Sequence, residues 1–197
     1  SADVAVAAGR IADIGTLDAG GADEVLDATG LVVLPGVIDT QVHFREPGLE
    51  HKEDLESGTR AAVMGGVTAV FEMPNTSPAT IDAAALEEKL TRAEGRAWCD
   101  HAFFIGAAAE NADALGELER LPGCCGVKIF MGSSTGSLLV HEDEVLRRVL
   151  RSGQRRVAVH SEDEPRLRER FELIREGGKV AQHPEWRDVE TAVLSTK

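Results

Sequence analysis

The feature that most constrains the fold is an alternation of short apolar segments with helical patterns that begins near Leu34. Apolar segments separated by helix-length stretches are typical of parallel β/α units. The expected strands are 37–44, 67–73, 100–107, 126–131 and 157–160, and the expected helices are 52–64, 83–94, 113–121, 142–152, 167–175 and 186–197. Asp82 is the expected N-cap of the second helix, and Gly95 is the residue expected to stop it.

Five β/α units are too few to close a (β/α)₈ barrel, which needs eight strands and typically ~250 residues. An open parallel sheet would expose two unpaired edges, which a protein in water must cover. We therefore expect these residues to be the N-terminal part of a longer chain. The alternative is that they are only the portion of the protein for which there is a structure.

The first 34 residues have a different pattern. DVAVAAGRIADIG and EVLDATGLVVLPG are short segments with β character, and Gly9 and Gly30 are the expected turns. We expect short β-strands here and a division of the chain into residues 1–34 and 35–197.

Composition excludes several functional classes. The 197 residues are 43% hydrophobic and 28% charged, which is typical of a globular domain, and they contain no apolar run or leader that predicts a membrane span or a secretory signal. A net charge of −13 repels nucleic acid and anionic membranes, so neither is expected as a partner. Cys99, Cys124 and Cys125 form a poor disulfide framework, and we expect reduced thiols in a cytoplasmic protein.

A polar alternation follows the first apolar segment. Asp39, Gln41, His43 and Arg45 are spaced two residues apart, and in a regular strand such side chains share one face. A carboxylate, an amide, an imidazole and a guanidinium on one face are costly to bury without partners. A Pro-Gly pair then turns the chain. The pattern predicts a functional site at the end of this strand.

Four segments carry a family resemblance. DTQVHFREPG resembles the first-strand signature of cyclic amidohydrolases, and of dihydroorotases in particular, and the resemblance continues through GGVTAVFEMPNTSP, GVKIFMGSSTG and VAVHSEDE. It implies a (β/α)₈ TIM-type barrel of the metal-dependent amidohydrolase kind, with a small β-sandwich made from both chain ends. Residues 1–34 would be the N-terminal share of that sandwich.

The resemblance implies three metal ligands, His43, Lys128 and His160, for one or two zinc ions. A lysine buried in an apolar strand loses its proton readily, and the neutral amine can react with CO₂ to give a carbamate that bridges two metals. These residues fall late in their strands, where a barrel of this kind carries its chemistry. The alternatives are a lysine that extends outward to solvent and a histidine that serves as a cap or core residue.

Gln41 departs from the family signature, which has a metal-binding histidine at this position. An amide oxygen is a weak zinc ligand. Three interpretations stay open: Gln41 holds a water molecule, coordinates weakly, or marks a site that has lost one metal.

The resemblance also implies that Arg45 and Asn75 hold a substrate carboxylate, because guanidinium makes paired hydrogen bonds to such a group. This pair is the reason to expect a dihydroorotase of pyrimidine biosynthesis, acting on a small anionic cyclic amide. The alternative for Arg45 is an ion pair with Glu46 or Asp39. A further metal histidine and a catalytic aspartate are expected beyond residue 197, so no general base is assigned.

Two other functions stay open. One is another cyclic amidase, of the allantoinase or hydantoinase kind. The other is an inactive dihydroorotase-like protein that acts as the structural partner of a carbamoyltransferase. A homo-oligomer is a further expectation.

Overall fold

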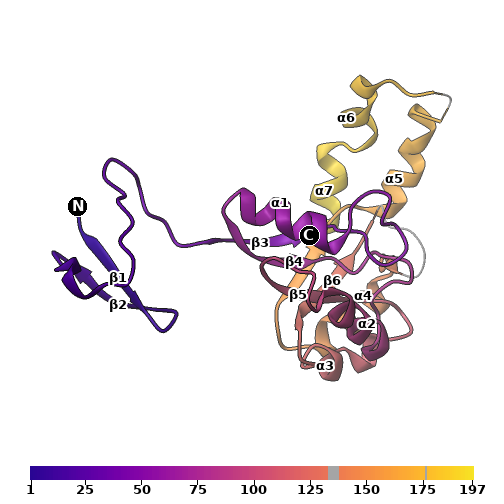
Figure 1. The fold of residues 1–197 in the computed structure, drawn as a ribbon. Coiled ribbons are helices and arrows are strands. Elements are labelled where there is room, and N and C mark those ends of the chain that lie inside the picture. Colours follow the sequence, from indigo (N-terminus) through magenta and orange to yellow (C-terminus); the bar gives the residue numbers. More distant parts are fainter. Residues whose placement is uncertain (133–137, 176) are drawn as a thin grey trace. The chain divides into compact units, whose positions relative to one another are not determined.

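The computed structural model describes residues 1–132, 138–175 and 177–197, which form two compact units, Ser1–Pro35 and Gly36–Lys197 (Figure 1). In the first unit, β1 (Asp3–Ala7) pairs antiparallel with β2 (Arg10–Gly15). The turn between them uses Ala8 and Gly9, whose φ angles of 50° and 72° lie in the left-handed region.

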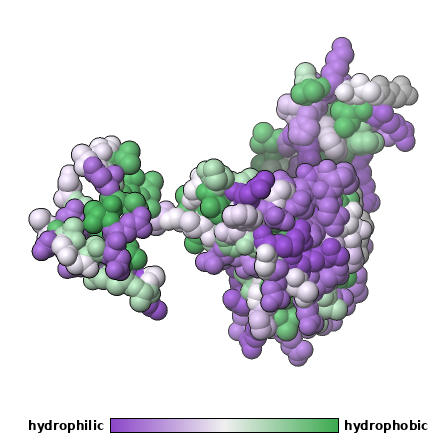
Figure 2. All heavy atoms as spheres, in the orientation of Figure 1, coloured by the Kyte–Doolittle hydropathy of each residue, from purple (hydrophilic) through white to green (hydrophobic). Residues whose placement is uncertain are grey.

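The strand expected in residues 24–35 does not form, and the β-sandwich is not confirmed. This segment is irregular, and its apolar side chains Val25, Leu26 and Leu31 are 64%, 83% and 73% exposed. Figure 2 shows such apolar residues as green spheres on the surface of this unit. A β-strand needs a neighbouring strand to which it can form hydrogen bonds. A single hairpin buries too little apolar surface to hold a third strand.

The second unit contains a parallel sheet in the sequential order β3-β4-β5-β6-β7, so β3 and β7 are its edges. The strands are β3 (Val37–Val42), β4 (Val67–Glu72), β5 (Asp100–Gly106), β6 (Cys124–Phe130) and β7 (Val157–His160). All five strands expected from the sequence are confirmed. Their order and direction are those of part of a (β/α)₈ barrel.

The helices are shorter than expected. They are α1 (Leu55–Met64), α2 (Ala83–Ala93), α3 (Leu115–Leu118), α4 (Asp143–Ser152), α5 (Glu164–Arg170), α6 (His183–Trp186) and α7 (Val189–Thr196). Asp82 caps α2 as expected, and its carboxylate accepts the Ala85 amide. The last expected helix, 186–197, starts only at Val189, because Asp188 takes an extended conformation and caps α7. No described helix is long and apolar enough to cross a membrane.

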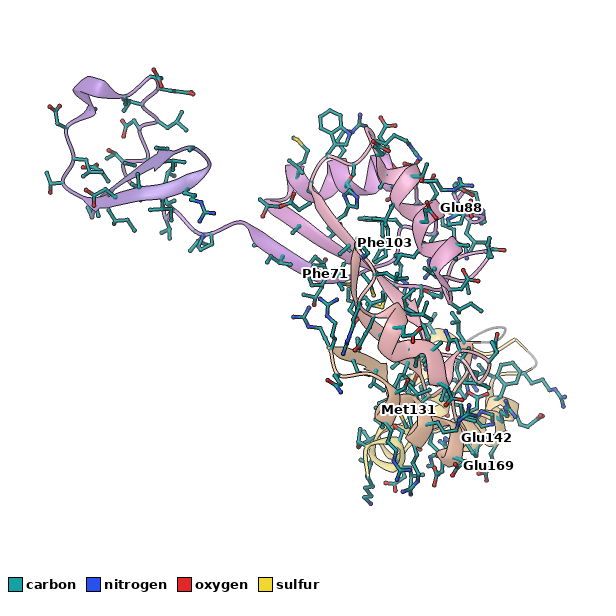
Figure 3. All side chains as sticks on the ribbon, turned by 90° about the horizontal axis from the view of Figure 1, so that it is seen from below. Phe71, Glu88, Phe103, Met131, Glu142 and Glu169 are labelled. Carbon is teal, nitrogen blue, oxygen red and sulfur yellow. The ribbon has the colours of Figure 1, made fainter. Side chains whose placement is uncertain are left out.

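Two apolar clusters lie on opposite faces of the sheet. Phe103, Val127 and Ile129 belong to the larger one, which also contains Leu86 of α2 and Leu115 of α3. The smaller one contains Met73, Phe104 and Cys125, with Phe71 and Ala158 against it. Figure 3 labels Phe71 and Phe103, which come from neighbouring strands and belong to different clusters. The first face is covered by helices, and the second corresponds to a barrel interior.

The three cysteines are unpaired, and Cys124 and Cys125 are buried. Burial raises the pKa of Cys125 to about 12, so this thiol stays protonated at neutral pH.

Candidate metal and substrate site

A register shift decides which side chains of β3 face the barrel interior. Asp39 lies opposite Val70 and Val42 lies opposite Glu72, so the two residues between them on β3 match a single residue on β4. Val70 packs in the helix-side cluster, as does Val42. Asp39 therefore lies on the helix side, whereas His43, next to Val42, lies on the interior side. The expectation that Asp39 and His43 share a face is wrong, because the irregular pairing breaks the alternation.

His43 contacts the loop that follows β4. Its Nδ1 lies 2.9 Å from Asn75 Oδ1, and with Nδ1–H donating to this oxygen, Nε2 keeps a free lone pair. Burial lowers the pKa of His43, and the positive charges of Arg45, Lys128 and Lys89 lower it further. A neutral imidazole with a free Nε2 is the form that binds a metal ion. Asn75 thus contacts His43, and substrate binding by Asn75 stays a prediction.

The loops after β3 and β4 are joined by their backbones. The amide N of Ser77 donates to the Pro47 carbonyl oxygen at 2.9 Å. Gly48 has a φ angle of 88°, and a Cβ atom at this position would lie 2.1 Å from the Ser77 carbonyl oxygen. Only glycine allows this approach, which brings Asn75 to His43.

Lys128 lies on the interior face of β6. Its neighbours Val127 and Ile129 belong to the helix-side cluster, whereas Ala158, opposite Lys128 on β7, packs in the interior cluster. The lysine is 2% exposed, and its Nζ lies 4.9 Å from the centre of the Phe130 ring. Burial lowers its pKa, and it forms no ion pair with the described residues. This burial contradicts the alternative of a lysine that extends to solvent.

His160 ends β7 on the same interior face. It lies opposite Phe130, and the two rings are stacked with centroids 6.1 Å apart. Its Nε2 contacts the Glu162 carboxylate and lies 3.3 Å from a terminal nitrogen of Arg187. Phe130 therefore contacts both His160 and Lys128.

Sequence reasoning missed Glu162 and Arg187 as neighbours of the site. The Glu162 carboxylate accepts hydrogen bonds from Arg187 and contacts His160. The Arg187 hydrogen bond lowers the pKa of Glu162 against burial, with a smaller contribution from His160. The two residues are far apart along the chain, so no local pattern could have indicated this contact.

Arg45 follows β3 with a φ angle of 65°. Its side chain forms no ion pair in the described part of the chain. Glu46 is instead buried, where it accepts the Leu55 amide at 2.9 Å and pairs with Arg96 at 2.7 Å. The alternative in which Arg45 pairs with Glu46 or Asp39 is therefore wrong, and the guanidinium is available to a ligand.

The donor set fits a metal only if Lys128 takes part. Among residues 1–132, 138–175 and 177–197, no three His, Cys, Asp or Glu side chains form a group that could hold an ion. His43 and His160 lie on the same face of the sheet as Lys128, and a carbamate on this amine would add an anionic oxygen donor to the two imidazoles. Metal binding by these three residues stays a prediction. The last four residues of the GVKIFMGSSTG segment, 133–136, lie outside the described residues.

Gln41 gives the first testable prediction. It is exposed, two residues before His43. Replacing Gln41 by histidine in the full-length protein is expected to raise the bound zinc, because imidazole is a much stronger ligand than an amide oxygen. Elemental analysis of the dialysed protein measures this change. Gln41→Asn, which keeps an amide, is the matched control, and equal metal content in the two variants would contradict a ligand position.

The chain is similar to proteins described as dihydro-orotase-like, allantoinase and hydantoinase. The family described as "Dihydro-orotase-like" matches residues 30–115. The chain is 48% identical over 132 residues to an allantoinase from Escherichia coli strain SMS-3-5 / SECEC, covering 66% of this chain and 29% of the relative. The allantoinase of strain K12 / DH10B is 47% identical over the same length.

Solved structures give the same result. L-hydantoinase (dihydropyrimidinase) from Arthrobacter aurescens matches with a TM-score of 0.89 and 26% identity, over 98% of this chain and 45% of that one. D-hydantoinase from Bacillus sp. AR9 matches with a TM-score of 0.81 and 28% identity, over 99% and 44%. The chain thus spans less than a third of the curated relatives and less than half of the solved structures.

Proposed function

We propose that this chain, which belongs to the cyclic amidohydrolase superfamily and carries five β/α units of its partial (β/α)₈ barrel, is part of a metal-dependent hydrolase that opens a cyclic amide of the allantoin type. The observation that carries the proposal is the buried Lys128, which has no ion-pair partner in the described residues and lies on one face with His43 and His160. Such an arrangement of donors at the carboxyl ends of barrel strands suits hydrolysis assisted by a metal ion.

The preference for dihydroorotase is replaced by its alternative. That preference depended on Arg45 and Asn75 acting together on a substrate carboxylate, but Asn75 contacts His43. The named relatives are allantoinases and hydantoinases, and only the family description mentions dihydroorotase. Allantoin is uncharged, and Arg45 would donate hydrogen bonds to its carbonyl oxygens.

The reaction is the hydrolysis of one ring amide. The oxygen of water bonds to the ring carbonyl carbon, the carbon–nitrogen bond breaks, and the leaving nitrogen takes a proton. A bound metal ion would lower the pKa of water to roughly 7 and polarise the carbonyl group. Within this chain, His43, His160 and carbamylated Lys128 would hold the metal, and Asn75 would fix the His43 ring. The proton donor is expected in the part of the barrel that follows residue 197.

A substrate panel tests the proposal. The full-length protein is assayed with allantoin, hydantoin and dihydroorotate, and ring opening is followed by chromatography. We expect kcat/KM for allantoin to exceed the other two values by about 100-fold, because a site with matched hydrogen bonds discriminates by several kcal/mol. Selective opening of dihydroorotate would overturn the substrate assignment.

Dihydroorotase remains the second candidate because the Arg45 guanidinium has no ion pair within the described residues and would suit an anionic substrate. Arg45→Lys separates the two. It is expected to raise KM for an anionic substrate more than for allantoin. Absence of turnover together with less than about 0.2 zinc per chain would favour the inactive partner of a carbamoyltransferase.

A further inference from the structure

The second buried lysine of the chain lies behind the site, on the helix side of the sheet. Lys89 of α2 donates to Glu72 of β4 with Nζ 2.8 Å from Oε2, and the two side chains are 0% and 1% exposed. Removing two charges from water costs several kcal/mol per ion, and an apolar pair of similar volume is often equally stable. A stable core alone therefore does not require this ion pair.

Lys89 also holds the start of the loop that carries Asn75. Its Nζ donates to the Met73 carbonyl oxygen at 3.2 Å, and its ammonium group lies 5.3 Å from the centre of the Phe103 ring. The Met73 amide in turn donates to the Val42 carbonyl oxygen at 2.9 Å, directly before His43. Lys89 thus anchors the end of β4, and Met73 connects this end to the end of β3 through its backbone amide.

Glu72 lies near the loop that follows β3 and carries Arg45. It lies opposite Val42 in the sheet register. Burial raises its pKa, whereas the charge of Lys89 and the backbone amide of Arg45 lower it. The carboxylate therefore lies near the residue at which the first loop adopts its left-handed conformation. Its Oε1 has no hydrogen bond within the described residues.

We propose that Glu72 and Lys89 are positioning residues, which hold the loops of Arg45 and Asn75 in the geometry that the reaction needs. This inference rests on the proposed function and extends it to two residues that do not touch the substrate. The directional bonds of Lys89 to two oxygens fix the end of β4, and the bond from the Met73 amide to the Val42 carbonyl oxygen joins this end to β3. An apolar pair would fill the same space without fixing this position.

The experiment separates positioning from stability with three variants of the full-length protein. Lys89→Met leaves a buried carboxylate without its partner, so it is expected to lower Tm. Lys89→Met/Glu72→Met removes both charges and is expected to recover most of the wild-type Tm. Its kcat for allantoin is nevertheless expected to stay about 100-fold below wild type, because small displacements of a site have effects of this size. A double variant with wild-type kcat would overturn the proposal.

Glu72→Gln keeps an oxygen acceptor for Lys89 and is the conservative variant. It is expected to retain kcat within about tenfold of wild type. If the double variant fails to fold, Glu72→Gln still tests the proposal. A loss of kcat in Glu72→Gln as large as that in Lys89→Met would show that the hydrogen-bond geometry does not matter, and would contradict the positioning role. The matched control is Glu119→Gln, a buried carboxylate that accepts the Gln154 and Arg155 amides before β7 starts. It is expected to lower Tm without changing kcat.

Hydrogen exchange provides a readout that does not depend on turnover. In Lys89→Met/Glu72→Met, amides of residues 44–50 and 74–80 are expected to exchange faster than in wild type, whereas Glu119→Gln leaves both segments unchanged. If the wild-type protein opens no cyclic amide, the proposed function is refuted. The positioning role is then still tested, because hydrogen exchange does not depend on turnover. Unchanged exchange in both segments would overturn the positioning role itself.

Discussion

Replacing Lys128 by methionine is expected to abolish ring opening by the full-length protein while its fold is retained. Lys128 is 2% exposed and has no ion-pair partner among the described residues, so methionine fills its space without leaving an unpaired charge. The change removes the amine that would carry the carbamate. We expect kcat/KM to fall by at least about 1,000-fold, because a metal ion supplies several kcal/mol of transition-state stabilisation. Steady-state kinetics and metal analysis measure the effect.

The control for this prediction is Lys52→Met, which removes an exposed lysine. It is expected to leave both kcat/KM and metal content unchanged. Wild-type protein prepared with isotopically labelled bicarbonate is expected to retain a carbamate signal in NMR spectra, and Lys128→Met is expected to lack it. Full activity of Lys128→Met would remove this residue from the proposed site.

The sheet could be predicted from the sequence because its signals are local. The strand expected at 157–160 has these limits in the structure, and the one expected at 100–107 ends one residue early. Each strand is an apolar run between turn residues, and parallel order follows from the intervening helices. The segment 24–35 has a similar pattern, but it pairs with neither β1 nor β2 of the first unit. Pairing is a tertiary property, so the pattern alone could not decide it.

The candidate site was partly predictable for the same reason. His43, Lys128 and His160 fall late in their strands, and the structure puts them on one face. The side of Asp39 was not predictable, because the register shift is set by pairing with β4. The contact between Asn75 and His43 was not predictable either, because it depends on the meeting of two loops.

The Glu72–Lys89 pair could have been predicted from the sequence. In α2 the buried positions are Leu86, Lys89 and Ala93, which form one face with helical spacing. A lysine on the apolar face of a helix requires a buried partner. Glu72, at the end of the largely apolar strand β4, is the acid that this requirement indicates.

Replacing Gly48 by alanine is expected to damage the site more than any other single-methyl change. The added Cβ would lie 2.1 Å from the Ser77 carbonyl oxygen, so the two loops must separate. Their separation breaks the bond between the Ser77 amide and the Pro47 carbonyl oxygen, and it moves Asn75 away from His43. We expect kcat/KM to fall by about 100-fold, the usual effect of a displacement near 1 Å. Kinetics with the preferred substrate measure the loss.

Gly66→Ala is a matched control, because it separates this contact from backbone strain. Gly66 has a φ angle of 87°, nearly that of Gly48, but a Cβ atom there would meet nothing within 4 Å. Both variants carry the cost of a left-handed alanine, which is roughly 1–2 kcal/mol. Gly66→Ala is therefore expected to lower Tm modestly and to keep kcat/KM. Equal kinetic losses in the two variants would mean that general destabilisation, and not the meeting of the two loops, limits the site.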